Sequence, residues 1–270
     1  MTAVNRVNVG TATGALTTYD LQTVVCSSRV TLGECAGHHA AEVLRRVLAE
    51  KGAARLMLAA ARSQEDTLRT LAAEPDIAWR RVTCFHMDEY IGLAPHAPQG
   101  FANWLERTFF EHLPQAPVFH RIPVANAATE AAVQYEQIMG NEPFDLVLLG
   151  IGVNGHLAFN DPPAALRDRA AARIVQIDAV SRKQQVDEGH FRALAEVPRM
   201  AVTVTIPRLL HAREVIASVP GAEKRQAVAA ALEMPVSGSH PATALRTHPK
   251  TTLYVDDESA PTVAARSSEP

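Results

Sequence analysis

Short, continuous apolar runs recur along the chain and alternate with stretches in which apolar residues have helical spacing. The clearest run is DLVLLGIG at 145–152, which is closed by glycines. Comparable runs predict strands at 54–61, 81–86, 201–206, 214–219 and 251–256, and the spacing predicts helices at 63–73, 101–113, 128–139 and 222–232. Ser63 is a candidate N-cap for the first of these helices. Because apolar strands that alternate with helices are typical of a parallel sheet buried on both faces, we expect an α/β fold with an open, Rossmann-like parallel sheet.

No stretch of the sequence has the composition of an interdomain linker. We therefore expect one α/β domain over residues 1–270, with flexible ends at 1–20 and 259–270. With 47% hydrophobic and 20% charged residues, the chain has the composition of a globular protein with a sizeable core. Its net charge of -3 gives no reason to expect a nucleic-acid partner, and no run is long enough to span a membrane.

The cysteines and the N-terminal segment bear on the compartment. Cys26, Cys35 and Cys84 are odd in number and widely spaced, which fits neither a disulfide framework nor a zinc site. The first 20 residues lack the basic and apolar regions of a signal peptide. These features favour a cytoplasmic protein.

Ligands of parallel α/β sheets bind beyond the carboxyl ends of the strands, so polar residues that follow the predicted strands are the candidate site. Asp88 and Glu89 follow the 81–86 strand. Because neighbouring residues of an extended segment point in opposite directions, only one of these carboxylates can face a given site. A surface turn is the alternative explanation for the pair.

A glycine-rich turn follows the 145–152 run and permits close approach of backbone N–H groups to a ligand. His156 lies just beyond this turn and is a candidate for proton transfer, since imidazole as a group titrates near neutrality. A histidine that caps a turn is equally compatible with the pattern. Asp161 lies in an Asn-Asp-Pro-Pro sequence, where turn formation alone would explain it.

Two cationic positions are candidates for binding an anion. Lys224 falls in the first turn of the 222–232 helix, where a lysine opposes the helix dipole unless a phosphate lies between them. Arg182 and Lys183 lie in a segment full of charges, which by itself is typical of a solvated surface.

Five segments resemble the motifs of one known family. HMDEYIGL at 86–93 and GIGVNGHLAFNDP at 150–162 resemble the two long motifs of the glucosamine-6-phosphate deaminases. Ser181–Arg182, the segment 221–224 and TALRTHP at 243–249 resemble shorter elements of that family. The matches occur in the family's order, from about residue 55 to residue 257. The chain is identified as a member of this family, within a superfamily that includes the 6-phosphogluconolactonases.

The resemblance implies an activity and a set of site residues. The activity is isomerisation and deamination of an amino-sugar phosphate, the expected small-molecule partner, without cofactor or metal. Asp88 matches the base that moves the C2 proton to C1, and His156 matches the group that opens the sugar ring. Asn154 and Asp161 match the residues that orient this histidine. The phosphate is expected to be bound by Ser63, Gln64, Arg182 and Lys224. A homo-oligomer is compatible with the sequence, which does not determine the oligomeric state.

Three positions depart from the family pattern. Asp161 replaces a glutamate, Arg62 replaces a glycine of the usual phosphate loop, and Val175 stands where a lysine of an allosteric site is expected. The alternatives are a 6-phosphogluconolactonase, a deaminase of another hexosamine phosphate, or a non-catalytic sugar-phosphate sensor. The FNDP and MDEY sequences favour a deaminase over a lactonase. The joint presence of a candidate base and an oriented histidine argues against a sensor.

Overall fold

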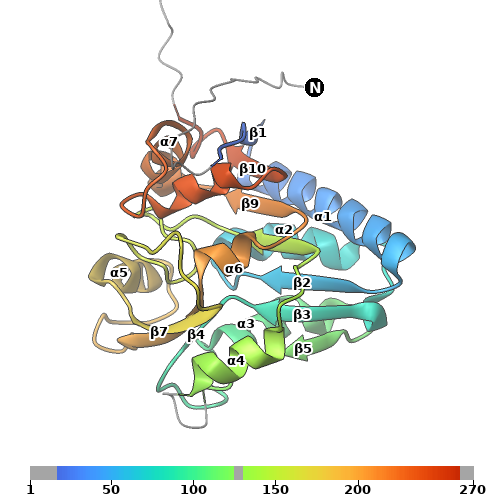
Figure 1. The fold of residues 1–270 in the computed structure, drawn as a ribbon, viewed down its shortest axis with the longest axis horizontal. Helices are drawn as coiled ribbons and strands as arrows, with labels where there is room; N and C mark the ends of the chain where they lie inside the picture. The colour runs from blue at the N-terminus through green and yellow to red at the C-terminus, as the bar shows by residue number, and fades with distance from the viewer. Residues whose placement is uncertain (1–16, 125–129, 262–270) are drawn as a thin grey trace, which may run out of the picture.

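The computed structural model describes residues 17–124 and 130–261. Helices cover both faces of a large central sheet, and a small second sheet lies beside it (Figure 1). The strands are β1 (Gln22–Cys26), β2 (Ala54–Leu58), β3 (Val82–His86), β4 (Asp88–Tyr90), β5 (Val118–His120), β6 (Leu146–Leu149), β7 (Ala172–Gln176), β8 (Met200–Val204), β9 (Val215–Val219) and β10 (Thr251–Asp256). The α-helices are α1 (Arg29–Lys51), α2 (Glu65–Ala73), α3 (Phe101–Thr108), α4 (Ala131–Met139), α5 (Ala179–Asp187), α6 (Ile206–Leu210) and α7 (Arg225–Glu233). Short 3-10 helices include η1 (Arg62–Gln64), η4 (Ala222–Lys224) and η5 (Pro241–Thr247).

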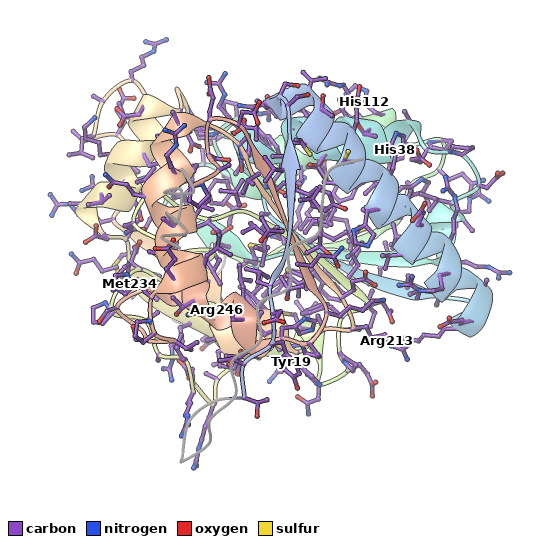
Figure 2. The ribbon with its side chains drawn as sticks, turned by 90° about the horizontal axis from the view of Figure 1, so that it is seen from above. Tyr19, His38, His112, Arg213, Met234 and Arg246 are labelled. Carbon is purple, nitrogen blue, oxygen red and sulfur yellow. The ribbon has the colours of Figure 1, made fainter. Side chains whose placement is uncertain are left out.

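The seven-stranded sheet has the order β1-β10-β9-β6-β2-β3-β5, and all of its strand pairs are parallel. This confirms the predicted fold class. Successive side chains of a strand point to opposite faces, and in β2 Leu56 and Leu58 join one core whereas Met57 joins the other. The first core includes residues of α1 and α2, and the second includes residues of α4, α6, α7 and η5. Figure 2 shows α1 (blue) and the C-terminal helical segments (orange) on opposite sides of the sheet.

One strand assignment needs correction. The run at 201–206 was expected to join the parallel sheet, but β8 lies in a three-stranded antiparallel sheet of order β4-β8-β7. The chain passes from the large sheet to the small one at Met87, which follows β3. The Met87 N–H donates to the Leu58 carbonyl at 3.1 Å, and its own carbonyl accepts from the Val204 N–H at 2.7 Å. Asp88 therefore begins its strand at the junction of the two sheets.

Buried polar contacts hold the end of β3 at this junction. The Tyr135 hydroxyl accepts from the His86 N–H at 3.1 Å and donates to the His86 carbonyl at 2.8 Å. The His86 Nε2 accepts from the Ile122 N–H at 2.8 Å. Burial, with a smaller effect of the Arg121 charge, lowers the pKa of His86 to about 3, so this imidazole is neutral at pH 7. The hydrogen bonds of His86 with Tyr135 and Ile122 therefore fix the backbone that leads into Asp88.

The structure differs from the sequence prediction at the start of α2 and in three helices that were not predicted, α1, α5 and α6. Ser63 does not cap α2, because the chain forms η1 there and no side chain caps either helix. The 23-residue α1 was not predicted, since small residues make up much of its buried face: Gly33, Ala36, Gly37, Ala40 and Ala41. Among the described residues, no helix combines the length and the apolar character needed to cross a membrane.

The expected flexible ends fall mainly outside the described residues, which omit 1–16 and 262–270. Ser259, where the C-terminal tail was expected to begin, is fully buried, and its N–H donates to Asp256 Oδ1 at 2.8 Å. At the other end, the Tyr19 N–H donates to the Arg246 carbonyl at 2.6 Å.

Glycine at position 33 lets α1 approach α2 closely. A Cβ at Gly33 would lie 2.3 Å from the Cβ of Asp66. Gly33→Ala should therefore destabilise the protein by about 1–3 kcal/mol, the usual cost of overpacking, although alanine is the better helix former. Chemical denaturation of this variant beside Glu34→Ala, at an exposed position of the same helix, measures the effect. Equal stability of the two variants would contradict the close packing.

Candidate active site

A pocket opens at the carboxyl ends of β2, β6 and β9, beside the start of β4. Its lining includes Ser63, Asp88, His156 and Lys224, which the sequence places in four separate segments. Parallel strands present their carboxyl ends at the same sheet edge, which is why the loops that follow them meet. Four of the eight predicted site residues thus line one pocket.

The adjacent carboxylates Asp88 and Glu89 have separate surroundings, as the extended backbone requires. Glu89 turns away from the pocket and caps α3, which has no side-chain cap of its own. Its Oε1 accepts from the Phe101 N–H and its Oε2 from the Ala102 N–H, both at 2.9 Å. A carboxylate at this position also interacts favourably with the helix dipole. Glu89 therefore has a structural role.

Asp88 faces the pocket. Its residue surface is 8% exposed, and no donor among the described residues hydrogen-bonds its carboxylate. Burial, reinforced by the neighbouring Glu89 charge, raises the pKa of Asp88 well above its ordinary value. A carboxylate with a raised pKa is a stronger base, which suits proton abstraction near neutral pH.

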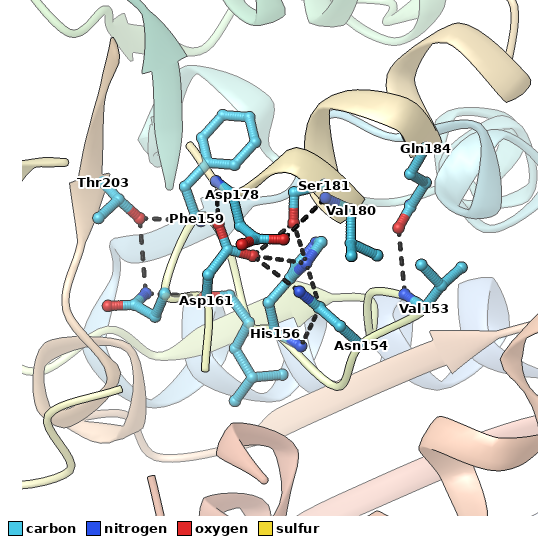
Figure 3. A network of polar contacts seen from close by, with 12 residues as sticks. Val153, Asn154, His156, Phe159, Asp161, Asp178, Val180, Ser181, Gln184 and Thr203 are labelled. Carbon is cyan, nitrogen blue, oxygen red and sulfur yellow. Dashed lines mark hydrogen bonds and ion pairs between the residues drawn. The ribbon is translucent and has the colours of Figure 1, made fainter. Parts of the chain in front are cut away.

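His156 is oriented entirely through its Nδ1 atom (Figure 3). This atom lies 2.8 Å from Asn154 Oδ1, 2.8 Å from Ser181 Oγ and 3.3 Å from Asp161 Oδ1. The Ser181 hydroxyl donates its one hydrogen to Asp161 Oδ1, so it cannot donate to Nδ1. All three neighbours of Nδ1 are then acceptors, and Nδ1 carries the proton. The neutral imidazole then carries its lone pair on Nε2, and this nitrogen is the one available for proton exchange with a ligand.

Asp161 anchors this network. Burial alone would raise the pKa of Asp161. The hydrogen bond and charge of His156 oppose this effect, as do the hydrogen bonds from Ser181 and the Asp178 N–H, and the pKa of Asp161 is lowered to about 2. The carboxylate therefore stays ionised and can stabilise a protonated imidazole. Although aspartate is one methylene shorter than glutamate, Ser181 and Asn154 both contact Asp161 and His156, and so close the gap.

Glycine is required at position 152 for the imidazole to lie where it does. A Cβ there would come within 2.1 Å of the His156 ring. Nearby, Asn160 fixes the same loop, because its Nδ2 donates to the carbonyls of Leu157 at 2.7 Å and Val204 at 2.9 Å. The glycine-rich motif thus serves to seat the histidine against the backbone.

One face of α5 forms a polar wall of the pocket that the sequence analysis missed. Ser181, Gln184, Gln185 and Glu188 recur at positions i, i+3, i+4 and i+7, the spacing of a single helix face. Gln184 Oε1 accepts from the Val153 N–H at 3.1 Å, and Gln185 Oε1 accepts from the Tyr90 hydroxyl at 2.7 Å. A periodic stripe of polar residues, three of them uncharged, was the available signal, but the charges around it suggested a solvated surface.

Two residues expected to bind phosphate do not line the pocket. Gln64 is buried, and its Nε2 donates to Ser63 Oγ and to the Ser218 carbonyl, each at 3.1 Å. The Arg182 guanidinium points along the far side of α5 and donates to the carbonyls of Leu194 at 2.6 Å and Val197 at 2.9 Å. These corrections leave Ser63 and Lys224 as the expected phosphate ligands that reach the pocket.

The described residues contain no cluster of three or more histidine, cysteine, aspartate or glutamate side chains suited to a metal ion. A buried carboxylate and an oriented imidazole that face one cavity can perform acid–base chemistry on a small ligand.

The sequence of this chain is similar to one known protein family and to several curated proteins. Residues 27–254 match the family described as glucosamine-6-phosphate isomerases/6-phosphogluconolactonase. Because the match covers most of the chain, the protein belongs to this family. A glucosamine-6-phosphate deaminase of Hahella chejuensis is 32% identical over 84% of this chain and 87% of its own. Glucosamine-6-phosphate deaminase 1 of Bacillus subtilis is 31% identical over 82% and 92%.

Solved structures of proteins with these two activities have a similar fold. A monomeric glucosamine-6-phosphate deaminase superposes with a TM-score of 0.80 at 27% identity, over 88% of this chain and 98% of its own. A 6-phosphogluconolactonase of Thermotoga maritima has a TM-score of 0.72 at 18% identity, over 87% and 98%, and shares the fold.

Asp88→Asn should raise the melting temperature at pH 7, because it removes a carboxylate that is costly to ionise in its buried place. The pKa of Asp88 in the folded protein lies above the unfolded value of about 3.9. Folded protein therefore retains a proton that the unfolded chain has already released, and wild-type stability falls as pH rises through this range. The gain from asparagine should be absent below about pH 4 and grow toward neutrality.

Thermal unfolding of wild type and Asp88→Asn between pH 4 and pH 8 measures this difference. Asp187→Asn is the matched control, since its side chain is 57% exposed and lies on the outer face of α5. A melting temperature of Asp88→Asn at or below that of wild type at pH 7 would show that the buried carboxylate is not destabilising.

Proposed function

We propose that this protein is a glucosamine-6-phosphate deaminase, which converts an amino-sugar 6-phosphate and water to a ketose 6-phosphate and ammonia. The observation that carries the proposal is the convergence of Asp88 and His156 on one pocket. The first is a buried base without a hydrogen-bond partner among the described residues, and the second is oriented by an ionised carboxylate. The similarity to the curated deaminases over most of the chain supports the same conclusion.

The two groups have complementary tasks in such a reaction. His156 takes the proton of the C1 hydroxyl at Nε2 and delivers it to the ring oxygen, which opens the sugar to the aldehyde. Asp88 then takes the proton from C2 and returns it to C1, so that the amine-bearing C2 becomes an imine. Water adds to this imine, and ammonia leaves. Asn154 and Asp161, which both lie close to Nδ1, hold the ring in place.

Ser63 and Lys224 form the phosphate end of the pocket in this proposal. Lys224 is the last residue of η4, immediately before α7, and its side chain is 4% exposed. A phosphate between this ammonium and the helix start would reconcile the lysine with the helix dipole. The phosphate supplies binding energy remote from the reacting carbons, and this energy can position C1 and C2.

The state of Asp88 also weighs against a non-catalytic sensor. A sensor needs residues that bind the sugar phosphate, but it has no use for a buried carboxylate that lowers stability. A solved 6-phosphogluconolactonase shares the fold at 18% identity, whereas two curated deaminases are 32% and 34% identical over 84% and 72% of this chain. We also infer a cytoplasmic location, which the three free cysteines support.

Purified protein should release ammonia and form ketose phosphate in equal amounts from a hexosamine 6-phosphate, without added metal or cofactor. Asp88→Asn should lower kcat by roughly 10²-fold or more, since the general base is lost while the fold is kept. Hydrolysis of 6-phosphogluconolactone with no ammonia from any hexosamine phosphate would indicate a lactonase. Binding of sugar phosphates without turnover of either substrate would indicate a sensor.

Lys224→Ala should raise KM for the phosphorylated sugar by roughly ten- to a hundredfold, since a hydrogen bond to a charged group contributes about 1.5–3 kcal/mol. Lys183→Ala removes the same charge from an exposed position of α5 and should leave KM unchanged. Arg182→Ala should lower thermal stability more than it raises KM, since its guanidinium holds two backbone carbonyls. An unchanged KM in Lys224→Ala would place the phosphate elsewhere.

A further inference from the structure

A second carboxylate lies at the phosphate end of the pocket, and neither the fold nor the proposed chemistry requires it. Glu188 directly follows α5 and lines the pocket together with Lys224. Its Oε1 lies 3.8 Å from Lys224 Nζ. This distance is too long for a hydrogen bond, but it permits a strong attraction between opposite charges away from bulk water.

Lys224 has its donors free. Among the residues described, no acceptor lies within hydrogen-bond distance of its ammonium, although the side chain is almost entirely buried. Leaving a buried ammonium without an opposite charge is costly. Glu188 supplies that charge, and its distance leaves the three N–H donors of Lys224 available to a ligand.

Glu188 is held by neighbours other than Lys224. Gln184 Nε2 donates to its Oε1 at 2.6 Å, and His190 Nε2 lies 3.6 Å from its Oε2. On the backbone, Arg62 donates to the Glu188 carbonyl at 2.7 Å, which fixes this residue beside η1. Contacts with three residues therefore fix Glu188 at the pocket, two of them to its carboxylate and one to its backbone.

We propose that Glu188 competes with the substrate phosphate for Lys224, and that it thereby keeps inorganic phosphate, which makes no contacts through a sugar, from occupying the pocket. This inference rests on the proposed role of Lys224 in binding the phosphate. A phosphate oxygen that accepts from Nζ at about 2.9 Å would lie within about 7 Å of the Glu188 carboxylate, close enough for marked repulsion inside a buried pocket. The anion alone is then bound weakly, and only a ligand with further contacts through its sugar overcomes the repulsion.

Glu188→Gln tests this role, because the new amide oxygen can still accept from Gln184 while the negative charge is removed. The inhibition constant for inorganic phosphate should fall by about fivefold or more, since a like charge beside the bound anion is lost. KM for the hexosamine 6-phosphate should fall as well, since the same repulsion acts on its phosphate. A residue with only a structural role would lower kcat or stability and would not tighten phosphate binding.

Glu223→Gln is the matched control. Its carboxylate also acts on the Lys224 charge, but the side chain is exposed and outside the pocket lining, so phosphate affinity should change little. Glu188→Asp, which keeps the charge but draws it back by one methylene, should tighten phosphate binding by less than Glu188→Gln. It also serves as the test if Glu188→Gln does not fold.

Calorimetric titration of each variant with inorganic phosphate makes the experiment independent of turnover. Tighter binding by Glu188→Gln supports competition even if no ammonia is released, in which case the proposed function alone fails. Unchanged or weaker phosphate binding by Glu188→Gln, or an equal gain in Glu223→Gln, would overturn the role of Glu188 whatever the enzyme assay shows.

Discussion

The common direction of the central strands is the constraint on which the pocket depends. Because β2, β3, β6 and β9 are parallel, the segments that leave their carboxyl ends emerge at one edge of the sheet. Ser63 follows β2, Asp88 follows β3, His156 follows β6 and Lys224 follows β9. Four chemically different side chains, spread over more than half of the sequence, are brought together by strand polarity.

The small antiparallel sheet adds what the large sheet does not provide. It captures the chain directly after β3, so Asp88 starts a strand at the junction and has no freedom to turn toward solvent. Burial there raises the pKa of Asp88. The carboxylate of its neighbour Glu89 instead accepts hydrogen bonds from the N-terminal N–H groups of α3. Two adjacent acids thus acquire opposite roles from the alternation of an extended backbone. One stabilises the fold, and the other is held at a cost in stability.

The pocket joins two electrostatic arrangements. At one end, the ionised Asp161 and its hydrogen bonds hold an imidazole whose free nitrogen faces the ligand. At the other, a buried ammonium is balanced by Glu188 at a distance that leaves its donors free. Helix α5 connects the ends, since Ser181 contacts the histidine network and Gln184 hydrogen-bonds Glu188. One helix face therefore spans the cavity.

The sequence by itself determined the fold class, the family and the polar residues at the strand ends. Apolar periodicity and turn residues are local signals, and they marked β6, β9 and β10 and the loops that follow them. Tertiary structure alone decided the orientation of side chains. It turned Arg182 toward the Leu194 and Val197 carbonyls, which lie in a segment that follows α5 and accept from its guanidinium.

Other features were equally hidden from local patterns. The polar stripe of α5 carries no apolar periodicity, and α1 buries glycine and alanine where large residues would mark a helix face. The antiparallel pairing of β8 depends on a partner strand more than a hundred residues away in the sequence. Spacing along the chain reports which residues share a face, but only packing against distant segments decides what that face meets.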